Sequence, residues 1–542
     1  MDDLAAVAER VASYSSRRKK TELLAAYLRR LSDEDLPRAV RFLSGRPFAA
    51  HDPRSLSVGH AILCEAAVAA SGWDQETVRL AIRETGDVGE AVSLLMIGRS
   101  EGQPLSLAQA EALYGELYRR RRAAEKTELL VQCLLRHSPH SLKYFIKIVS
   151  GDLRIGLQQK TIEDAVALAA GVPPDALRQA SNRLGDAAQA ALAARHGSLQ
   201  QARARLFRPL EFMLAKPIGS AHDVPDPENW LIEDKYDGVR TQAHLDAGRV
   251  MLYSRGLAEV TGAFPELEAA LEAVPGSAVL DGEVVAYKDG RILPFAVLQQ
   301  RLARKVVPLF LPAEAPVAFI AYDLLFRDGS ELLDRPLEER RARLEATLAG
   351  CGPPLLLSPQ WTAHTAAELE RLFQEARARG QEGLVLKRRG SLYEAGRRGG
   401  AWLKWKRPLA TLDVVITAAE QGHGRRAGVL SDYTFAVRSP EGFVNVGKAY
   451  SGLTDEEIRE LTALLHAAAV ERRGGAVLVR PEIVLEVAFD AIQRSSRHNS
   501  GYALRFPRIV RWRRDKRPGD ADELERVRQI YERLAESARQ RK

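Results

Sequence analysis

The spacing of apolar residues changes twice along the chain, so no single architecture accounts for all of it. From residue 1 to about 205, apolar residues recur at helical spacing between charged ones, as in Thr21–Leu31 and Lys126–Ser138. From Leu214 to Lys406, short apolar runs alternate with turns and with helical segments. Beyond residue 408 the pattern is rich in strands and glycine turns. The sequence therefore predicts a multidomain protein.

Three domains follow from these changes, because 542 residues at roughly 100–200 residues per domain give about three. We predict an all-α domain over residues 1–207 and an α+β domain over residues 208–407. Residues 408–542 are predicted to form a small β-barrel of the oligonucleotide-binding kind, the OB-fold, which ends in a charged and exposed helix.

Charge and cysteine content narrow the partners and the compartment. The formal net charge of +8 favours a polyanion such as nucleic acid. Cys64, Cys133 and Cys351 lie far apart and form no Cys-x-x-Cys pair, which argues against disulfides and a zinc ribbon and for a reducing compartment. The N-terminus has no apolar signal core, and no apolar run reaches the ~18–20 residues of a membrane span. These features predict a cytoplasmic protein.

The segment Asp234–Arg240, with the sequence DKYDGVR, lies between two apolar runs. On its own it is typical of a strand that enters a tight Asp-Gly turn with solvated charges. Other polar residues lie in or beside strand-like runs downstream, namely Glu283, Tyr322, Glu382, Lys404 and Lys406. Because alternate side chains of a strand share one face, Lys404 and Lys406 are expected to point the same way. Taken singly, such lysines also suit a solvated strand edge that resists sheet-to-sheet pairing.

Together, these segments resemble the motifs of the covalent nucleotidyltransferases, and specifically of the ATP-dependent DNA ligases. Asp234–Arg240 resembles the family's Lys-x-Asp-Gly-x-Arg signature, and the later motifs follow in the family's order: Ser254–Gly256, Asp281–Tyr287, Ala321–Phe326, Glu382–Lys387, Trp402–Lys406 and Ala503–Pro518. Gly151–Ala169 resembles the helical DNA-binding domain of these ligases. The resemblance implies an α+β nucleotidyltransferase (adenylation) domain between an all-α domain and a C-terminal OB-fold β-barrel.

The resemblance also implies the catalytic residues. Lys235 would be the nucleophile that forms a lysine–AMP bond, and its amine must lose a proton from a pKa near 10.4 before it can attack. Lys404 and Lys406 would stabilise the α-phosphate as charge develops in the transition state. Glu283 and Glu382 would hold Mg²⁺ (or Mn²⁺), which prefers carboxylate and phosphate oxygens.

Binding roles are implied in the same way. The implied nucleotide contacts are Glu233 at the adenine amino group, Tyr322 stacked on the base, Arg240 at the ribose, and Arg255 and Arg398 at phosphates. Arg513 and Lys516 would contact pyrophosphate when the barrel domain closes. The implied DNA contacts are Arg154 and Lys160 in the helical domain and Lys216 ahead of the core, although for Arg154 and Lys160 solvated helix-end charge is an equal alternative.

The implied reaction is the ATP-dependent sealing of nicks in double-stranded DNA through a lysyl-AMP and then a DNA-adenylate intermediate. The barrel domain would swing about a hinge at residues 406–413. We expect a nucleoid-associated monomer in the cytoplasm, without a recognisable sliding-clamp motif.

RNA ligases and GTP-using mRNA-capping enzymes share the core motifs but lack the large helical region. A non-catalytic nick-binding protein is the alternative of another class, but the lysine and glutamates it would have lost are present.

Overall fold

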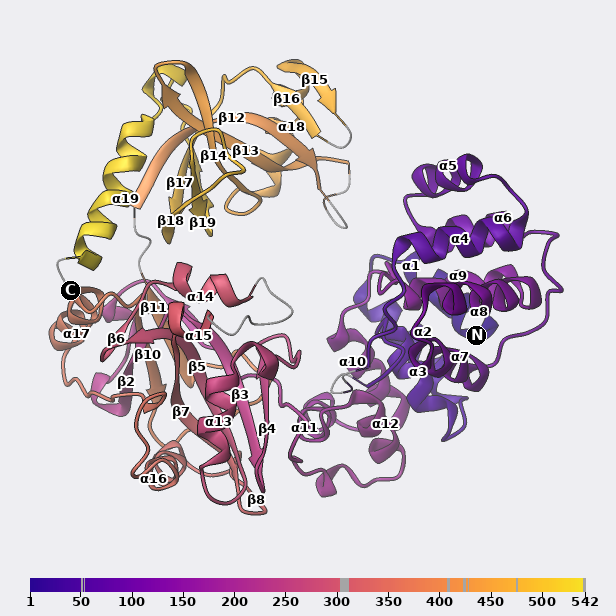
Figure 1. Cartoon of the computed structure of the whole chain (residues 1–542), viewed down its shortest axis with the longest axis horizontal. Coiled ribbons are helices and arrows are strands. Elements are labelled where there is room, and N and C mark those ends of the chain that lie inside the picture. Colours follow the sequence, from indigo (N-terminus) through magenta and orange to yellow (C-terminus); the bar gives the residue numbers. More distant parts are fainter. Residues whose placement is uncertain are drawn as a thin grey trace. The chain divides into compact units, whose positions relative to one another are not determined.

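The computed structural model describes residues 1–49, 52, 54–302, 311–406, 410–422, 426, 428–473 and 476–539 (Figure 1). The chain forms two compact units. The first unit comprises Met1–Lys216, Gly238–Pro359 and Lys387–Trp402. The second comprises Pro217–Asp237, Gln360–Leu386 and Leu403–Lys542. Each unit takes segments from distant parts of the sequence, and the domain boundaries at residues 207 and 407 stay predictions.

The N-terminal region of the first unit folds into α-helices, which confirms the predicted all-α domain. Polar caps begin several of them, because the side chains of Ser16, Asp74 and Ser106 accept hydrogen bonds from first-turn amides. The apolar faces share one core, in which the rings of Tyr114 and Phe145 stack with centroids 4.8 Å apart. The helices are α1 (Asp2–Ala12), α2 (Arg17–Arg29), α3 (Asp35–Leu43), α4 (His60–Ser71), α5 (Gln75–Thr85), α6 (Val88–Leu95), α7 (Leu107–Arg119), α8 (Ala123–Arg136), α9 (Pro139–Val149), α10 (Gln159–Ala170), α11 (Pro174–Leu184) and α12 (Ala187–Arg195).

Glu163 in α10 is a buried acid that should make the helical region less stable as pH rises. It accepts hydrogen bonds from Gln159 and Ser181, each at 3.3 Å. Burial raises its pKa from 4.5 to about 7, with a further contribution from Glu211. The unfolded chain therefore binds fewer protons than the folded chain between pH 4.5 and 7, so the free energy of unfolding falls across that window.

Glu163→Gln is accordingly expected to be more stable than the wild type at pH 8, by about 2–3 kcal/mol, and to lose this advantage near pH 5. Urea titrations at both pH values measure the difference. Glu128→Gln, at an exposed position of α8, is the matched control and should change stability by less than about 0.5 kcal/mol at either pH. A constant difference between the Glu163 variant and the wild type would contradict the prediction.

The rest of the first unit is built on a mainly antiparallel sheet with the strand order β4–β3–β5–β7–β8, to which β6 adds on β5 and β9 adds in parallel on β7. Leu280 and Phe319 on the central strands share an apolar core with Leu271 of α13 and Leu344 of α16. The elements are β3 (Val239–Asp246), β4 (Arg249–Ser254), α13 (Pro265–Glu272), β5 (Ala278–Lys288), β6 (Arg291–Ile292), α14 (Phe295–Leu302), α15 (Leu311–Glu314), β7 (Val317–Arg327), β8 (Ser330–Glu331), α16 (Leu337–Thr347) and β9 (Leu355–Leu357).

In the part of the second unit that precedes residue 407, the strands form a four-stranded sheet with the order β1–β11–β10–β2. Its elements are β1 (Lys216–Ile218), β2 (Trp230–Lys235), α17 (Ala366–Ala378), β10 (Gly383–Arg388) and β11 (Trp402–Lys406). Gly383 has φ +149°, and a Cβ there would lie 2.1 Å from the carbonyl oxygen of Trp405, so glycine lets β10 and β11 approach closely.

The C-terminal region forms a curled antiparallel sheet in which β12 pairs with β13, β16 and β17, which confirms the predicted β-barrel. The elements are β12 (Ala410–Gln421), β13 (Leu430–Ser439), β14 (Gly442–Ala449), α18 (Asp455–Ala467), β15 (Ala469–Arg473), β16 (Ala476–Val479), β17 (Val484–Phe489), β18 (Ala491–Arg494), β19 (Tyr502–Arg505), β20 (Arg508–Trp512) and α19 (Leu524–Arg539). The described charged side chains of the final helix are exposed as expected, but Val527 and Ile530 of α19 are buried in the barrel core, which the sequence analysis did not anticipate. Residues 407–409 of the predicted hinge lie outside the described residues.

Candidate active site

Lys235 is the last residue of β2, a strand whose other residues are buried. The amide of Glu382 donates to the carbonyl oxygen of Lys235 at 2.9 Å, and the two side chains form an ion pair. Their side chains are 22% and 19% exposed, so both charges are largely removed from water. Pairing of β2 with β10 thus brings together the predicted nucleophile and a predicted metal ligand.

Two carboxylates share this end of the sheet. Burial, followed by the charge of Glu382, raises the pKa of Asp237 to about 6. Burial also works against ionisation of Glu382, but Lys235 and then Lys406 outweigh it and lower the pKa of that carboxyl. Glu382 therefore stays charged beside Lys235. An additional positive charge nearby would stabilise the ionised form of Asp237.

Asp490 and Arg505 from the C-terminal region also contact this cluster, and the sequence analysis gave them no role. Lys406 Nζ lies 2.5 Å from Asp490 and 4.0 Å from Glu382. Arg505 lies 3.3 Å from Asp237. The only sequence signal for Asp490 is an acid directly after a buried strand.

Lys404 and Lys406 are half-buried on β11 and alternate with a fully buried Trp405. The Trp405 ring stacks on Phe373 of α17 with centroids 4.2 Å apart. This packing fixes the strand and confirms that the two lysines share a face, as the alternation predicted.

Glu233 lies on β2 and is 2% exposed. Its carboxylate accepts a hydrogen bond from Gln360 Nε2 at 2.7 Å. No sequence motif singles out Gln360, and the same is true of Asp490. A carboxylate this deeply buried needs hydrogen-bond partners. The Glu233 carboxylate can accept and the Gln360 amide can donate, so the pair can recognise a ligand ring that carries both a donor and an acceptor.

Arg240 lies on β3 in a buried polar network in the first unit. Its guanidinium forms two hydrogen bonds to Asp281, at 3.1 and 2.7 Å, and a third to the carbonyl oxygen of Met213 at 2.6 Å. The Tyr393 hydroxyl donates to the same Asp281 carboxylate at 2.7 Å and accepts from the Met213 amide at 3.2 Å. Burial, and then Asp281, raises the pKa of Tyr393, which keeps the phenol a donor.

Tyr393→Phe removes one donor from the buried Asp281 and should loosen Arg240. We expect the free energy of unfolding to fall by about 1.5–3 kcal/mol, the range for hydrogen bonds to charged groups. Tyr253→Phe is the matched control, because the hydroxyl of buried Tyr253 donates to a neutral acceptor, the carbonyl oxygen of Phe207, at 3.0 Å. Its expected loss is about 0.5–1.5 kcal/mol. Urea titrations of both variants test the ranking, and equal losses would contradict it.

Tyr322 on β7 is 8% exposed and lies beneath two cations. Lys387 Nζ is 4.4 Å from its ring centroid, and the Arg240 guanidinium carbon is 5.8 Å away. Trp402 meets the ring edge-on with centroids 6.4 Å apart. The predicted aromatic ring at position 322 is thus packed against two positively charged side chains and Trp402.

Glu283 is half-buried on β5 and pairs in register with Arg240 of β3. It lies against Gly238, where an added Cβ would be 2.8 Å from Glu283 Cγ and 2.3 Å from the Val284 carbonyl oxygen. The Asp-Gly turn after Lys235 therefore needs glycine for close packing on the strand that carries Glu283.

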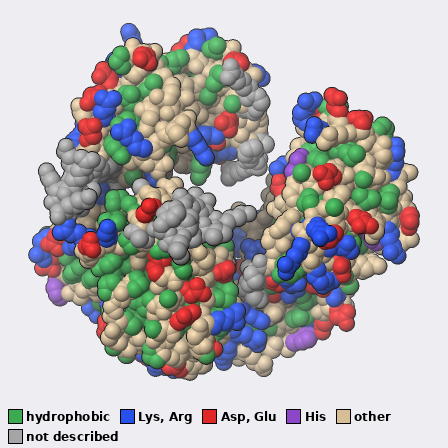
Figure 2. All heavy atoms as spheres, viewed as in Figure 1, with side chains coloured by type: hydrophobic (Ala, Val, Ile, Leu, Met, Phe, Trp, Pro, Cys, Tyr) green, Lys and Arg blue, Asp and Glu red, His purple; other side chains and the backbone are tan. Residues whose placement is uncertain are grey.

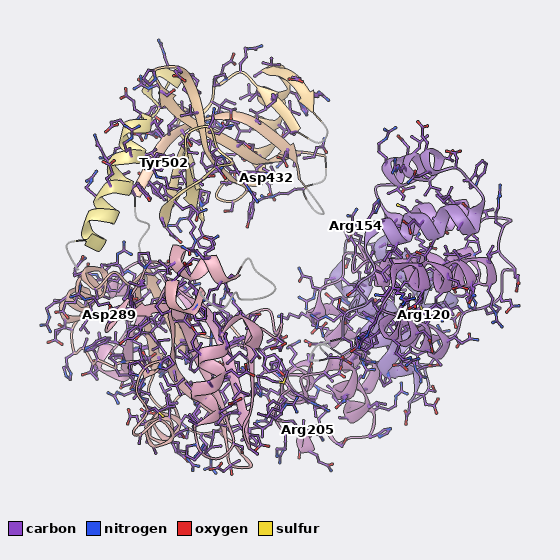
Figure 3. All side chains as sticks on the ribbon, viewed as in Figure 1. Arg120, Arg154, Arg205, Asp289, Asp432 and Tyr502 are labelled. Atoms are coloured by element: carbon purple, nitrogen blue, oxygen red, sulfur yellow. The ribbon has the colours of Figure 1, made fainter. Side chains whose placement is uncertain are left out.

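The other predicted residues lie elsewhere. Arg154, whose place in the helical region is labelled in Figure 3, pairs with Asp152 at 2.6 Å and donates to the Gly86 carbonyl oxygen at 2.7 Å. Arg513 and Lys516 both pair with Asp413, at 3.0 and 2.5 Å. The exposed remainder is Lys160, Lys216, Arg255 and Arg398. The structure joins none of these described residues to the Lys235–Glu382 pair, and their roles stay predictions.

Comparison with known proteins decides the family. Three family models match: DNA ligase N terminus over residues 1–167, ATP dependent DNA ligase domain over residues 212–406, and ATP dependent DNA ligase C terminal region over residues 426–516. A protein named probable DNA ligase from Koribacter versatilis is 41% identical, with 98% of this chain and 96% of that protein covered. The chain belongs to the ATP-dependent DNA ligase family.

Other similarities agree with this assignment. The DNA ligase of Methanoculleus marisnigri is 36% identical, with 98% of this chain and 97% of that protein covered. A solved structure titled Pmar-Lig_PreS3 covers 94% of this chain and 99% of its own with a TM-score of 0.60 and 16% identity, which shows a shared fold. As an ATP-dependent DNA ligase, the chain uses ATP as co-substrate and acts on DNA.

Among the described residues, no helix is long and apolar enough to cross a bilayer.

Proposed function

We propose that this ligase seals nicks between a 5′-phosphate and a 3′-hydroxyl in duplex DNA, through a lysyl-AMP and then a DNA-adenylate intermediate. The observation that carries the proposal is the ion pair of Lys235 with Glu382 at the buried end of β2, inside the family's nucleophile motif. The pair orients Nζ at a fixed point, which is what a nucleophile aimed at one phosphorus atom requires.

In the first step, Lys235 Nζ attacks the α-phosphorus of ATP, and pyrophosphate leaves. Lys235 must first lose a proton, and Glu382 orients the amine while remaining ionised itself. Lys404 and Lys406 stabilise the charge that develops on the α-phosphate. AMP then passes to the 5′-phosphate of the nick, and the 3′-hydroxyl attacks that phosphate and releases AMP.

Nucleotide binding falls to the other residues. Glu233, with Gln360 beside it, reads the adenine amino group, and Tyr322 stacks on the base. Arg240, held by Asp281, contacts the ribose. The phosphates are assigned to Arg255 and Arg398, and the leaving pyrophosphate to Arg513 and Lys516, which must exchange Asp413 for the phosphate.

A divalent cation fits the carboxylates at this site. The raised pKa of Asp237 beside Glu382 marks two acids close enough for a cation to stabilise both. The described residues hold no cluster of three or more histidine, cysteine or acidic ligands, so substrate phosphates would complete the shell, as is usual for Mg²⁺. Mg²⁺ or Mn²⁺ would neutralise phosphate charge, with Glu382 and Glu283 as the proposed ligands.

DNA is proposed to bind through its backbone, because a ligase cannot depend on sequence. Figure 2 shows Lys and Arg side chains among Asp and Glu on the visible face of the helical region, so contacts should come from individual cations such as Arg154 and Lys160. Lys216 is the proposed contact for the 5′-phosphate. We further propose a monomer that works in the cytoplasm with the nucleoid.

Nick sealing tests the proposal directly. Incubation with a 5′-labelled nicked duplex, Mg²⁺ and ATP is expected to give a joined strand, with a labelled DNA-adenylate when ligation is slowed at low pH. The same assay with GTP in place of ATP is the control for the capping-type alternative. Sealing with GTP alone, or binding of the nick without joining in either nucleotide, would contradict the proposal.

A further inference from the structure

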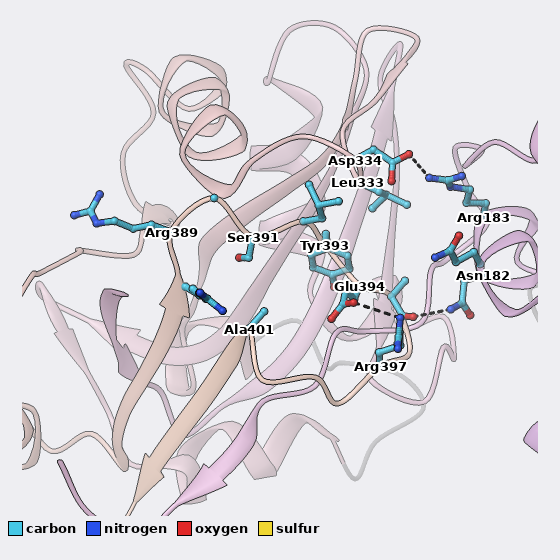
Figure 4. A pocket seen from close by; sticks show the side chains of 15 residues that line it. Asn182, Arg183, Leu333, Asp334, Arg389, Ser391, Tyr393, Glu394, Arg397 and Ala401 are labelled. Carbon is cyan, nitrogen blue, oxygen red and sulfur yellow. Dashed lines mark hydrogen bonds and ion pairs between the residues drawn. The ribbon is translucent and has the colours of Figure 1, made fainter. Parts of the chain in front are cut away.

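A cavity of about 530 Å³ lies in the first unit, between helix α11 and the loop that connects β10 to β11 (Figure 4). Its volume falls in the range of ligand pockets and suits one nucleotide unit. Asn182 and Arg183 come from α11, and Arg388, Arg389, Ser391 and Arg397 come from the other side. None of these is used in the reaction described above.

The cavity carries more positive than negative charge. Four arginines line it, against the acids Asp334 and Glu394. Arg183 is already engaged, because it pairs with Asp334 and with Glu331 at 2.8 Å. Arg397 is 52% exposed and lies 3.4 Å from Glu394. Such an exposed pair is weak, so a stronger anion can replace Glu394 as the partner of Arg397.

Arg388 and Ser391 offer side-chain donors that have no acceptor among the described residues. Arg388 is exposed at the end of β10 and has no acidic partner within the described part of the chain. The Ser391 hydroxyl oxygen is buried and has no hydrogen-bond partner among the described residues. An unsatisfied buried hydroxyl costs free energy, so it marks a place where a ligand acceptor would be favourable.

The loop that presents these donors is fixed from several sides. The Asn182 side-chain amide donates to the Ala395 carbonyl oxygen at 2.7 Å, and Arg340 donates to that of Ser391 at 2.9 Å. The Tyr393 amide donates to the Leu333 carbonyl oxygen at 3.0 Å. A ligand would therefore meet donors that are already ordered, which reduces the entropy lost on binding.

We propose that this cavity binds a phosphodiester of the nicked DNA, with Arg388 and the Ser391 hydroxyl as donors and Arg397 exchanging Glu394 for the phosphate. The inference rests on the proposed function, because it assigns a part of the DNA substrate to a site of its own. Arginine guanidinium groups and serine hydroxyls are the usual donors to backbone phosphates, and they position the duplex without reading its sequence.

Salt-dependent binding tests the site. The full chain is titrated onto a fluorescent nicked duplex with a 3′-dideoxy end, between 50 and 200 mM KCl. Loss of one phosphate contact in Arg388→Gln should reduce the slope of log K against log salt by about 0.9 and weaken binding several-fold at low salt. Arg388→Lys keeps the charge and should keep the slope. Ser391→Ala should weaken binding without changing the slope.

Arg343→Gln is the matched control, because Arg343 is exposed on α16 and pairs only with Glu339 among the described residues. It should bind and seal as the wild type does. A wild-type slope in Arg388→Gln would overturn the inference while leaving the proposed function intact, whereas a wild-type chain that seals no nick would overturn the function itself. A higher KM for ATP in lysine labelling with an unchanged DNA slope would assign the cavity to nucleotide and also overturn the inference.

Discussion

Lys235→Ala is expected to take up no label from α-³²P-ATP and to lose nick sealing by on the order of 10⁴-fold or more, since removal of a covalent nucleophile leaves no route to the intermediate. The wild type should give a labelled band on a denaturing gel, and nicked DNA should discharge it. Any AMP already bound is first removed with pyrophosphate, so that an unlabelled wild type cannot be mistaken for an inactive one.

Lys288→Ala is the control for this prediction. Lys288 is an exposed lysine at the end of β5, so its loss changes the charge equally without touching the Lys235–Glu382 pair. It should label and seal at the wild-type level. A label that persists in Lys235→Ala would mean that another residue is the nucleophile and would refute the mechanism proposed above.

Arg340→Met is expected to lower the free energy of unfolding by about 3–5 kcal/mol, because it leaves a buried carboxylate without its partner. Arg340 of α16 and Asp323 of β7 are both 0% exposed and share two hydrogen bonds of 2.8 Å. Hydrogen exchange of the β7 amides measures the local opening free energy, and a urea titration measures the whole transition.

Arg343→Met on the same helix is the matched control for Arg340. Its pair with Glu339 is exposed, so the expected loss is below about 1 kcal/mol. Pairing Arg340→Met with Asp323→Leu should recover much of the stability, because no buried charge then remains. Equal losses at Arg340 and Arg343, or no recovery in the double variant, would show that burial of the pair is not the cause.

Much of the fold could be predicted from the sequence, because apolar periodicity follows directly from which side chains leave water. The helical region, the strand-rich barrel and the shared face of Lys404 and Lys406 all came from spacing alone. The buried face of α19 was not expected, for a simple reason. Its many charges suggested exposure, although Leu524, Val527 and Ile530 recur at helical spacing and form the apolar stripe that packs on the barrel.

The site was less accessible from the sequence. Motif order placed Lys235 and Glu382 in one family pattern, and the pairing of β2 with β10 then brought them together. Gln360, Tyr393 and Asp490 belong to no such motif, and each acts on a residue far from it in the chain. One sequence contains no information on such long-range contacts, which arise when the sheets pack.

The interleaving of the two units has a consequence for how the enzyme can be made and dissected. The chain passes from one unit to the other after Lys216, Asp237, Pro359, Leu386 and Trp402, and the second of these crossings lies inside the Asp234–Arg240 motif, two residues after Lys235. During synthesis on the ribosome, the segment Pro217–Asp237, which contains Lys235, is made well before Gln360–Leu386 and Leu403–Lys542. Its unit can therefore be completed only after those later segments have been synthesised. Truncation after Asp237, Pro359 or Leu386 would leave both units incomplete in both products, so dissection at these points should yield poorly folded pieces unless the complementary fragments are co-expressed.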